Sequence, residues 1–269
     1  ELYNGPDSSN PTSQLFSDNF STNVYAAFGS VDYEVADNFD VSLALRYDIE
    51  QRKVSNRVPL VTDPITGAPI NPGQTGGAIP DKKETFKELQ PKLSLRYGLT
   101  DTLNFYANWG IGFNNQGAAA IVDQNFNQFI GTNILINDVF RKETSSAIEA
   151  GFKGSAADGA ITFDLAGYYT KVDDMQFFEF FVGSFGLLRV VSNIDKVDIY
   201  GVELNASAKI VEGWDIFGSV NLTESEIKAN ASRPYTVGNK SPHTADYTIN
   251  LGTQMVAPIA SSFDLVMRA

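Results

Sequence analysis

The feature that most constrains this sequence is an alternation of apolar and polar residues with a period of two. The clearest case has Phe39, Val41, Leu43, Leu45, Tyr47 and Ile49 in one phase, and Asp40, Ser42, Ala44, Arg46, Asp48 and Glu50 in the other. Successive side chains of a β-strand point to opposite faces, so this pattern predicts a strand with one apolar and one polar face. An amphipathic helix needs apolar residues three and four positions apart, and that spacing is not sustained anywhere in the chain.

The alternation recurs often enough to predict about ten strands. The expected ranges are 22–35, 39–53, 86–99, 103–114, 143–154, 160–181, 189–211, 214–228, 243–256 and 262–269. Strands of globular proteins usually hold about five or six residues, whereas a tilted strand that crosses a bilayer needs about 9–11. These lengths favour an all-β fold, an antiparallel transmembrane β-barrel. The residues expected to contact lipid include Leu43, Leu95, Phe105, Phe163, Leu204 and Ile249.

The connections between the expected strands alternate between short and long. The short ones are 36–38, 100–102, 155–159, 211–213 and a turn near Ala257-Pro258; the long ones are 54–85, 114–142, 182–188 and 229–242, with 1–21 at the start. Outer-membrane barrels combine short periplasmic turns with long extracellular loops. A soluble β-sandwich has no reason to alternate in this way, so the connections favour the barrel.

Composition excludes several other classes. Net charge is −12 and no basic cluster occurs, so a nucleic-acid partner is not expected. The absence of cysteine excludes a disulfide framework and a thiol nucleophile. Residues 1–6 do not resemble a signal peptide, so we expect a mature chain or one that begins inside a longer polypeptide.

Four groups of residues, in this order, resemble a known family. They are Pro91-Lys92 with Arg96-Tyr97, Tyr106-Ala107 and Gly112-Phe113; Glu149-Ala150-Gly151-Phe152-Lys153 with Tyr168-Tyr169; Tyr200-Gly201-Val202-Glu203-Leu204; and Pro242 with Tyr247. Together they resemble the barrel strands of TonB-dependent receptors, the energised transporters of Gram-negative outer membranes. The chain departs from the family at Asn114-Asn115-Gln116-Gly117, where Arg, Pro and Gly-Gly are common. That departure concerns a loop and leaves the strand pattern intact.

The resemblance implies the C-terminal portion of a receptor barrel. Such barrels have about 22 strands around a plugged lumen, so residues 1–269 are expected to form part of one barrel domain, with the plug domain and terminal strands outside the chain. The implied function is uptake of a scarce solute across the outer membrane: a siderophore, a cobalamin-like ligand or an oligosaccharide. The implied partners are outer-membrane lipid, that ligand and a TonB complex acting through the plug, without a cofactor. The alternatives are a passive porin-like channel and a structural or adhesive β-protein of the cell surface.

No enzyme activity is expected. His243 is the only histidine, and it stands beside Pro242 at an expected strand start, whereas a catalytic triad needs a base within hydrogen-bond reach of a nucleophile. Asp173-Asp174 and Asp195 with Asp198 could bind calcium, but their spacing matches no EF-hand, and solvated loops explain them better. An outer-membrane hydrolase is therefore disfavoured, and no metal site is expected.

The residues expected to line a ligand lie at strand ends and in loops. They are Arg52, Asn114, Asn115, Gln116, Phe178, Phe180, Arg233 and Tyr235. The aromatic segment 177–181 has two interpretations, a girdle at the membrane interface or a contact for an apolar part of a ligand. If alternation persists along this strand, Phe177 and Phe181 face lipid while Phe178 and Phe180 face the lumen. A bulge near Asp173-Asp174 would reverse this assignment.

Overall fold

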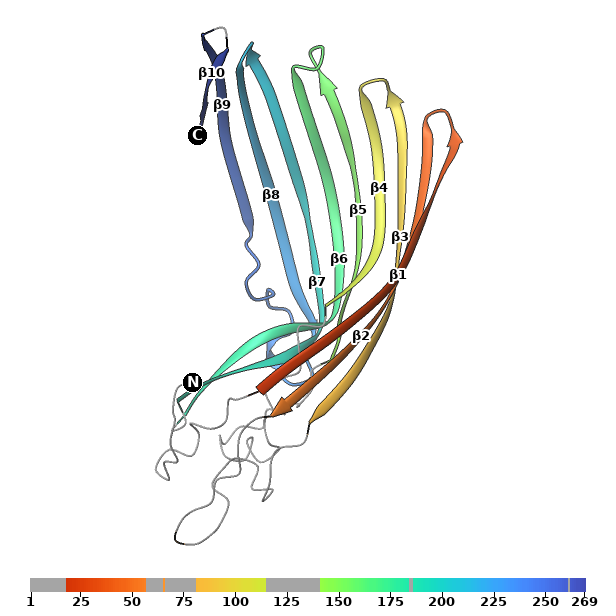
Figure 1. The fold of residues 1–269 in the computed structure, drawn as a ribbon, viewed down its shortest axis with the longest axis vertical. Coiled ribbons are helices and arrows are strands. Elements are labelled where there is room, and N and C mark those ends of the chain that lie inside the picture. The colour runs from red at the N-terminus through yellow and green to blue at the C-terminus, as the bar shows by residue number, and fades with distance from the viewer. Residues whose placement is uncertain (1–17, 57–64, 66–80, 115–140, 184–185, 261) are drawn as a thin grey trace.

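One antiparallel sheet contains almost all of the described chain. The computed structural model describes residues 18–56, 65, 81–114, 141–183, 186–260 and 262–269. Each strand pairs with its neighbours in sequence, in the order β1 to β10 (Figure 1). The strands are β1 (Asp18–Ala36), β2 (Phe39–Asn56), β3 (Lys82–Thr100), β4 (Leu103–Asn114), β5 (Glu143–Ala156), β6 (Ile161–Gly183), β7 (Gly186–Val211), β8 (Trp214–Ala229), β9 (Tyr247–Ala260) and β10 (Phe263–Arg268). The prediction of an all-β, antiparallel fold is confirmed, and within these residues β1 and β10 are open edges.

The short and long connections lie at opposite ends of the sheet. In Figure 1 the short turns, such as the one after β3, stand at the top, and β2 ends and β3 begins toward the bottom. The expected alternation is therefore confirmed, with one correction. Residues 182–188 do not form a long loop, because β6 and β7 continue as a paired hairpin up to Gly183 and Gly186.

Both expected limits of β9 are wrong by the same distance. The strand begins at Tyr247 instead of residue 243, because His243 has a left-handed backbone with φ of 59° and cannot continue a strand. The turn expected near Pro258 lies inside β9, since Pro258 is opposite Asp264 in the pairing with β10. The register shifts between Phe263 and Asp264, and such an irregularity is where a sheet accepts proline.

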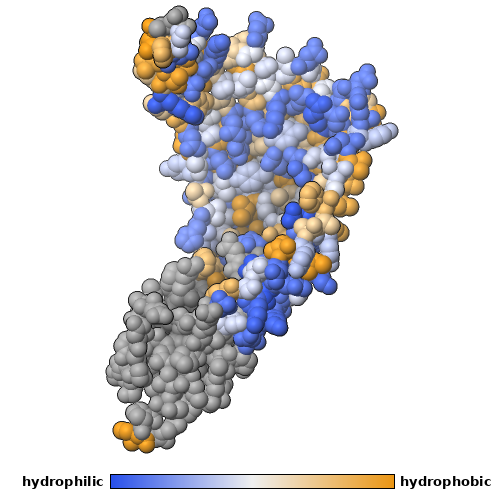
Figure 2. Space-filling model, in the orientation of Figure 1, coloured by the Kyte–Doolittle hydropathy of each residue, from blue (hydrophilic) through white to orange (hydrophobic). Residues whose placement is uncertain are grey.

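The strand register sorts the side chains into one apolar and one polar face. Directly paired residues share a face, and one row across four strands runs Leu165, Leu204, Val220, Ile249 while the adjacent row runs Asp164, Asn205, Ser219, Asn250. The six residues predicted to contact lipid all lie in the apolar phase that these pairings connect. The face shown in Figure 2 is mostly hydrophilic, with hydrophobic residues mainly at its margins.

Aromatic rings on the polar face lie across glycines of the next strand. Tyr168 of β6 is paired with Gly201 of β7 and extends over it. The Tyr168 hydroxyl forms a hydrogen bond with Thr223 Oγ1 of β8, at 2.7 Å. Tyr106 of β4 reaches over Gly151 in the same way and donates to a carboxylate of β6 at 3.0 Å. Each ring thus ties two strands that are not direct neighbours, which is possible because the intervening residue has no side chain.

Candidate functional site

Ionised side chains gather on the polar face of β2 and β3, toward the end that bears the long connections. Arg46 holds Asp48 with two hydrogen bonds, Nε to Oδ2 and Nη2 to Oδ1, each 2.7 Å long. Gln90 of β3 also donates to Asp48. Lys142, just before β5, pairs with Glu88 of β3. Asp48 is only 2% exposed, and its hydrogen bonds from Arg46 and Gln90 supply the compensation that a buried carboxylate requires.

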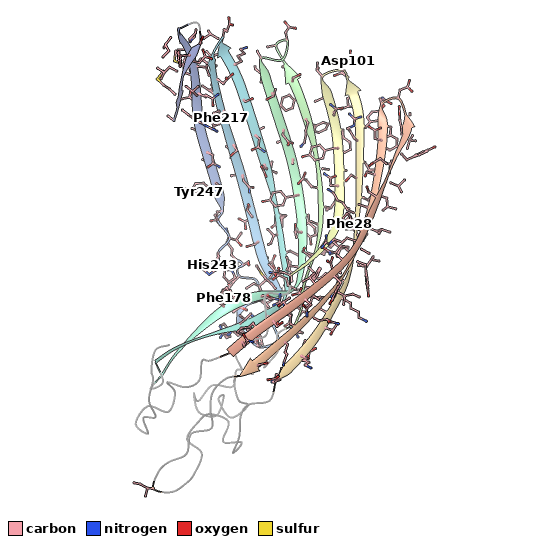
Figure 3. The ribbon with its side chains drawn as sticks, in the orientation of Figure 1. Phe28, Asp101, Phe178, Phe217, His243 and Tyr247 are labelled. Atoms are coloured by element: carbon pink, nitrogen blue, oxygen red, sulfur yellow. The ribbon has the colours of Figure 1, made fainter. Side chains whose placement is uncertain are left out.

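Arg52, one of the predicted ligand-lining residues, belongs to the same region. Its Nε donates to Glu50, a carboxylate that is itself buried. The guanidinium is therefore held by the wall and is not fully available to a ligand. A hollow of about 700 Å³ lies next to this region and is lined in part by Phe28, Arg46, Gln90, Asn108 and Glu149; Figure 3 marks Phe28 on β1.

The connection between β8 and β9, residues 230–246, forms a structured loop that we call the loop platform. Asn230 organises its start, because its Oδ1 accepts from the Arg233 backbone N–H at 3.1 Å and its Nδ2 donates to Thr236 Oγ1 at 3.0 Å. A short 3-10 helix, η2 (Pro234–Thr236), follows. Asn230 is buried, whereas Tyr235 is 77% exposed. The platform therefore presents Tyr235 to solvent from a fixed turn.

The far side of the loop platform is fastened to β8. The Ser241 backbone N–H donates to Ser225 Oγ at 3.0 Å, and both serines are buried. Lys240 Nζ lies 2.6 Å from Asp246 and 3.2 Å from Glu224. The hydrogen bonds that Lys240 donates to Asp246 and Glu224 stabilise its charged form and raise its pKa above the ordinary value. The platform is thus held at its start, middle and end.

A break in the β6–β7 hairpin carries a second set of ionic contacts. Asp174 has a left-handed backbone, with φ of 57°, and lies opposite Asp195. Arg141 joins the two strands, with Nε 2.8 Å from Asp174 Oδ1 and Nη2 paired with Asp195. The Ala231 backbone N–H donates to Asp195 at 2.5 Å. Asp195 lies beyond the apolar band of β7. The hydrogen bond from Ala231, and after it the contact with Arg141, holds the pKa of Asp195 below its ordinary value.

The break at Asp174 changes which aromatic residues face inward. A buried apolar cluster of Val172, Ile194, Val197 and Ile227 packs against Met175, Phe177 and Ile199. The lipid-facing assignment of Phe177 held only if the alternation persisted, and the irregularity at Asp174 reverses it as expected for a bulge there. Phe177 turns toward this cluster and the His243 ring, with centroids 6.1 Å apart. Phe178, the next residue, points to the opposite side and is 40% exposed (Figure 3). Its contact with a ligand stays a prediction.

The other predicted site residues fall in separate places. Asn114 ends β4, and its carbonyl oxygen accepts a hydrogen bond from Gln176 Nε2 at 3.0 Å. Asn115, Gln116 and the side chain of Phe180 lie outside the described residues. The structure therefore places Arg233 and Tyr235 together on the loop platform, and Arg52 in the wall of β2. Their role in ligand binding stays a prediction.

The residues that organise this end of the sheet were not predicted. Arg141 gives no local signal, because its partner Asp195 is 54 residues away. Asn230 was detectable in principle, since an asparagine shortly before a Ser-Arg-Pro segment is typical of a side-chain-capped turn. Within the described part of the chain, no group of three or more His, Cys, Asp or Glu could hold a metal ion. No helix in that part is both long and apolar enough to cross a membrane.

Long antiparallel strands with one apolar face, one polar face and short turns at one end define the wall of an outer-membrane β-barrel. Residues 1–262 match the family model described as TonB dependent receptor-like, beta-barrel. The chain belongs to this family, which agrees with the motif resemblance, and its location is the bacterial outer membrane.

Several relatives cover most of the chain. The pesticin receptor of Yersinia enterocolitica is 26% identical over 222 residues, which are 82% of this chain and 28% of the receptor. The ferric yersiniabactin uptake receptor FyuA from Yersinia pestis superposes with a TM-score of 0.65 at 23% identity, over 93% of this chain and 34% of FyuA. The siderophore receptor PiuA from Acinetobacter baumannii gives 0.63 at 15% identity, over 89% and 32%. The two solved structures show a shared fold, and this chain spans 28% to 34% of these relatives.

Residues 1–269 contain no cysteine, so once any cysteine elsewhere in the full-length protein is replaced, labelling tests which end of the sheet faces the cell exterior. Cysteine introduced as Tyr235→Cys should react with a membrane-impermeant maleimide on intact cells, because residue 235 is exposed at the end that bears the long connections. Asp158→Cys, in the short turn after β5, should react only after the outer membrane is permeabilised. Gel-shift labelling of the full-length protein gives the readout. Labelling of residue 158 alone on intact cells would show that the orientation is reversed.

Proposed function

We propose that the protein containing this chain is a TonB-dependent receptor that takes up a ferric siderophore. The observation that carries the proposal is the loop platform, a fixed turn that exposes Tyr235 and places the half-buried Arg233 beside it, at the end of the sheet we assign to the cell exterior. A guanidinium and a phenol suit an anionic, partly aromatic chelate, because arginine pairs with carboxylates and both groups stack on rings. The names of the pesticin receptor, FyuA and PiuA support this class of function.

In this proposal the chain contributes ten strands of a barrel of about 22. The plug domain and remaining strands belong to the rest of the polypeptide. The platform contacts the ligand outside, and the polar face of the sheet lines the lumen. A TonB complex of the inner membrane supplies energy through the plug, and no catalytic step or cofactor is assigned to this chain.

Uptake of labelled iron by the full-length protein tests the proposal. Cells that express it should accumulate iron-55 from ferric yersiniabactin or from another member of a siderophore panel, and this uptake should be lost in cells without TonB. The double variant Arg233→Gln, Tyr235→Ala should raise the half-saturating concentration about tenfold, since truncating contacts in a binding hot spot costs about 1–2 kcal/mol.

The control variant is Asp158→Ala, which lies in an exposed turn at the other end of the sheet and should leave uptake unchanged. Equal iron accumulation with and without TonB would contradict the proposal and support a passive channel instead. No accumulation from any siderophore, together with normal surface expression, would exclude siderophores and direct the search to cobalamin-like ligands and oligosaccharides.

A further inference from the structure

Three lysines gather on the apolar-phase side of β2 and β3, just beyond the apolar band. Lys53 is paired directly with Lys83, and Lys87 is paired with Ile49, the last apolar residue of the β2 band. Ile49 and Lys53 are four residues apart and therefore share a face, so all three lysines lie on the face that meets lipid. We call these three residues the lysine patch.

The lysine patch carries an excess of positive charge. Asp81 forms an ion pair with one of the three lysines, since its Oδ2 is 2.7 Å from Lys53 Nζ, and this contact lowers the pKa of Asp81. No carboxylate of the described residues forms an ion pair with Lys83 or Lys87, and both are exposed. Gln51 and Thr85 are paired between the lysines and add neutral hydrogen-bonding groups.

The outer rim of β6 to β8 also carries lysines, but each of them stands beside a carboxylate. There Lys171 is paired with Asp198, and Lys196 with Asp173, so each lysine faces a carboxylate on the next strand. Lys228 forms an ion pair with Glu226, 2.5 Å apart. Positive charge is therefore balanced on that side. In a chain of net charge −12, the unbalanced lysines of β2 and β3 are a local exception.

We propose that the lysine patch binds the phosphates of a phosphorylated lipid head group in the outer leaflet. The patch is at the depth where head groups begin, directly above the apolar residues Ile49 and Leu89. Lysine ammonium groups beside a membrane attract anionic head groups, and their long stems let them reach upward from the apolar surface. The lipid acyl chains would lie along the exposed apolar face below. The inference concerns lipid contact and is independent of the ligand that the receptor transports.

The test compares lipid retention by the full-length protein after purification in mild detergent. Bisphosphorylated lipid A and its dephosphorylated form are added separately, and bound lipid is counted by native mass spectrometry. The combined change Lys53→Gln, Lys83→Gln, Lys87→Gln should weaken retention of the bisphosphorylated form by about 25-fold. Each lysine near an anionic lipid surface contributes about fivefold, and Asp81 offsets one of the three. The same positions changed to arginine should retain it.

A matched control changes Lys171, Lys196 and Lys228 to glutamine, which alters net charge equally but on β6 to β8. Retention by this control should equal that of the unchanged protein. Inorganic phosphate at millimolar concentration should not displace the lipid. Equal retention by both glutamine variants, equal retention of the dephosphorylated form, or displacement by inorganic phosphate would each overturn the proposal. If the first glutamine variant does not show heat-modifiable folding, Lys83→Gln alone against Lys196→Gln alone decides between the same outcomes.

Discussion

Leu204→Arg should lower the free energy of unfolding of the barrel by about 2–4 kcal/mol, the cost measured for arginine on the lipid face near the bilayer midplane. On β7 the apolar-phase residues run from Ile210, next to the turn, to Tyr200, and Leu204 is near the middle of that band. A charged side chain there has no water to solvate it. Arginine can relieve part of the cost by extending toward a head group, which is why the expected range is moderate.

The control is Asn205→Arg, one residue away on the polar face. Asn205 is paired with Asp164 and Ser219, so an arginine at this position meets a carboxylate and other polar groups. Its effect on stability should stay below about 1 kcal/mol. Urea titration of the full-length protein refolded into lipid vesicles measures both. Equal losses for the two variants would show that the assignment of faces is incorrect.

Gly201→Ala should destabilise the barrel by about 1–3 kcal/mol, the usual cost of forcing extra volume into a packed site. A Cβ on residue 201 would be 2.2 Å from the Leu222 carbonyl oxygen and 2.6 Å from Tyr168 Oη. The backbone oxygen cannot move away without disturbing the β7–β8 pairing. The tyrosine would have to leave its position over the strand and lose its hydrogen bonds to Asn221 and Thr223.

Gly167→Ala provides the comparison, because it makes the same chemical change on the neighbouring strand. The nearest atom to a Cβ at Gly167 is 3.9 Å away, which is ordinary contact. We expect this variant to be neutral or up to about 1 kcal/mol more stable, since alanine restricts the unfolded chain. The unfolding temperature of each variant, followed by heat-modifiability on gels, gives the readout. Equal shifts would mean that the ring over residue 201 has no special role.

The strands and their faces could be predicted from sequence because alternate residues of a strand point to opposite faces, so the order of apolar and polar residues shows both. The failures have local or long-range causes that this period does not contain. β9 starts late because His243 adopts a left-handed backbone. The face of Phe177 could be given only as two alternatives, because Asp174 interrupts the alternation and is held by Arg141, a residue far away in sequence.

The candidate site could be predicted only in part, for a similar reason. Arg233 and Tyr235 stood out as residues of a long connection, which is where receptors present their ligand contacts. The groups that fix that connection, such as Asn230 and the pair of Ser225 with Ser241, are recognised only from their contacts. The structure does not unite Arg52 with the platform residues, because Arg52 is bound to its own strand by Glu50.

The motifs that resemble the family now have a physical explanation. Tyr106 and Gly151 belong to two different motifs in the sequence, yet they are direct partners across β4 and β5. Tyr168 and Gly201 are likewise partners across β6 and β7. Part of the resemblance therefore consists of residues that pack as pairs, since a bulky residue opposite either ring would displace it.

Rings that lie flat against the sheet also keep its polar face low. Tyr106, Tyr168 and Phe217 are large residues on this face, and each would extend away from the sheet if it projected from its strand. Their paired glycines let each ring extend sideways along the wall instead. How far the polar face projects from the sheet therefore depends on Gly151, Gly201 and Gly252 as much as on the rings themselves.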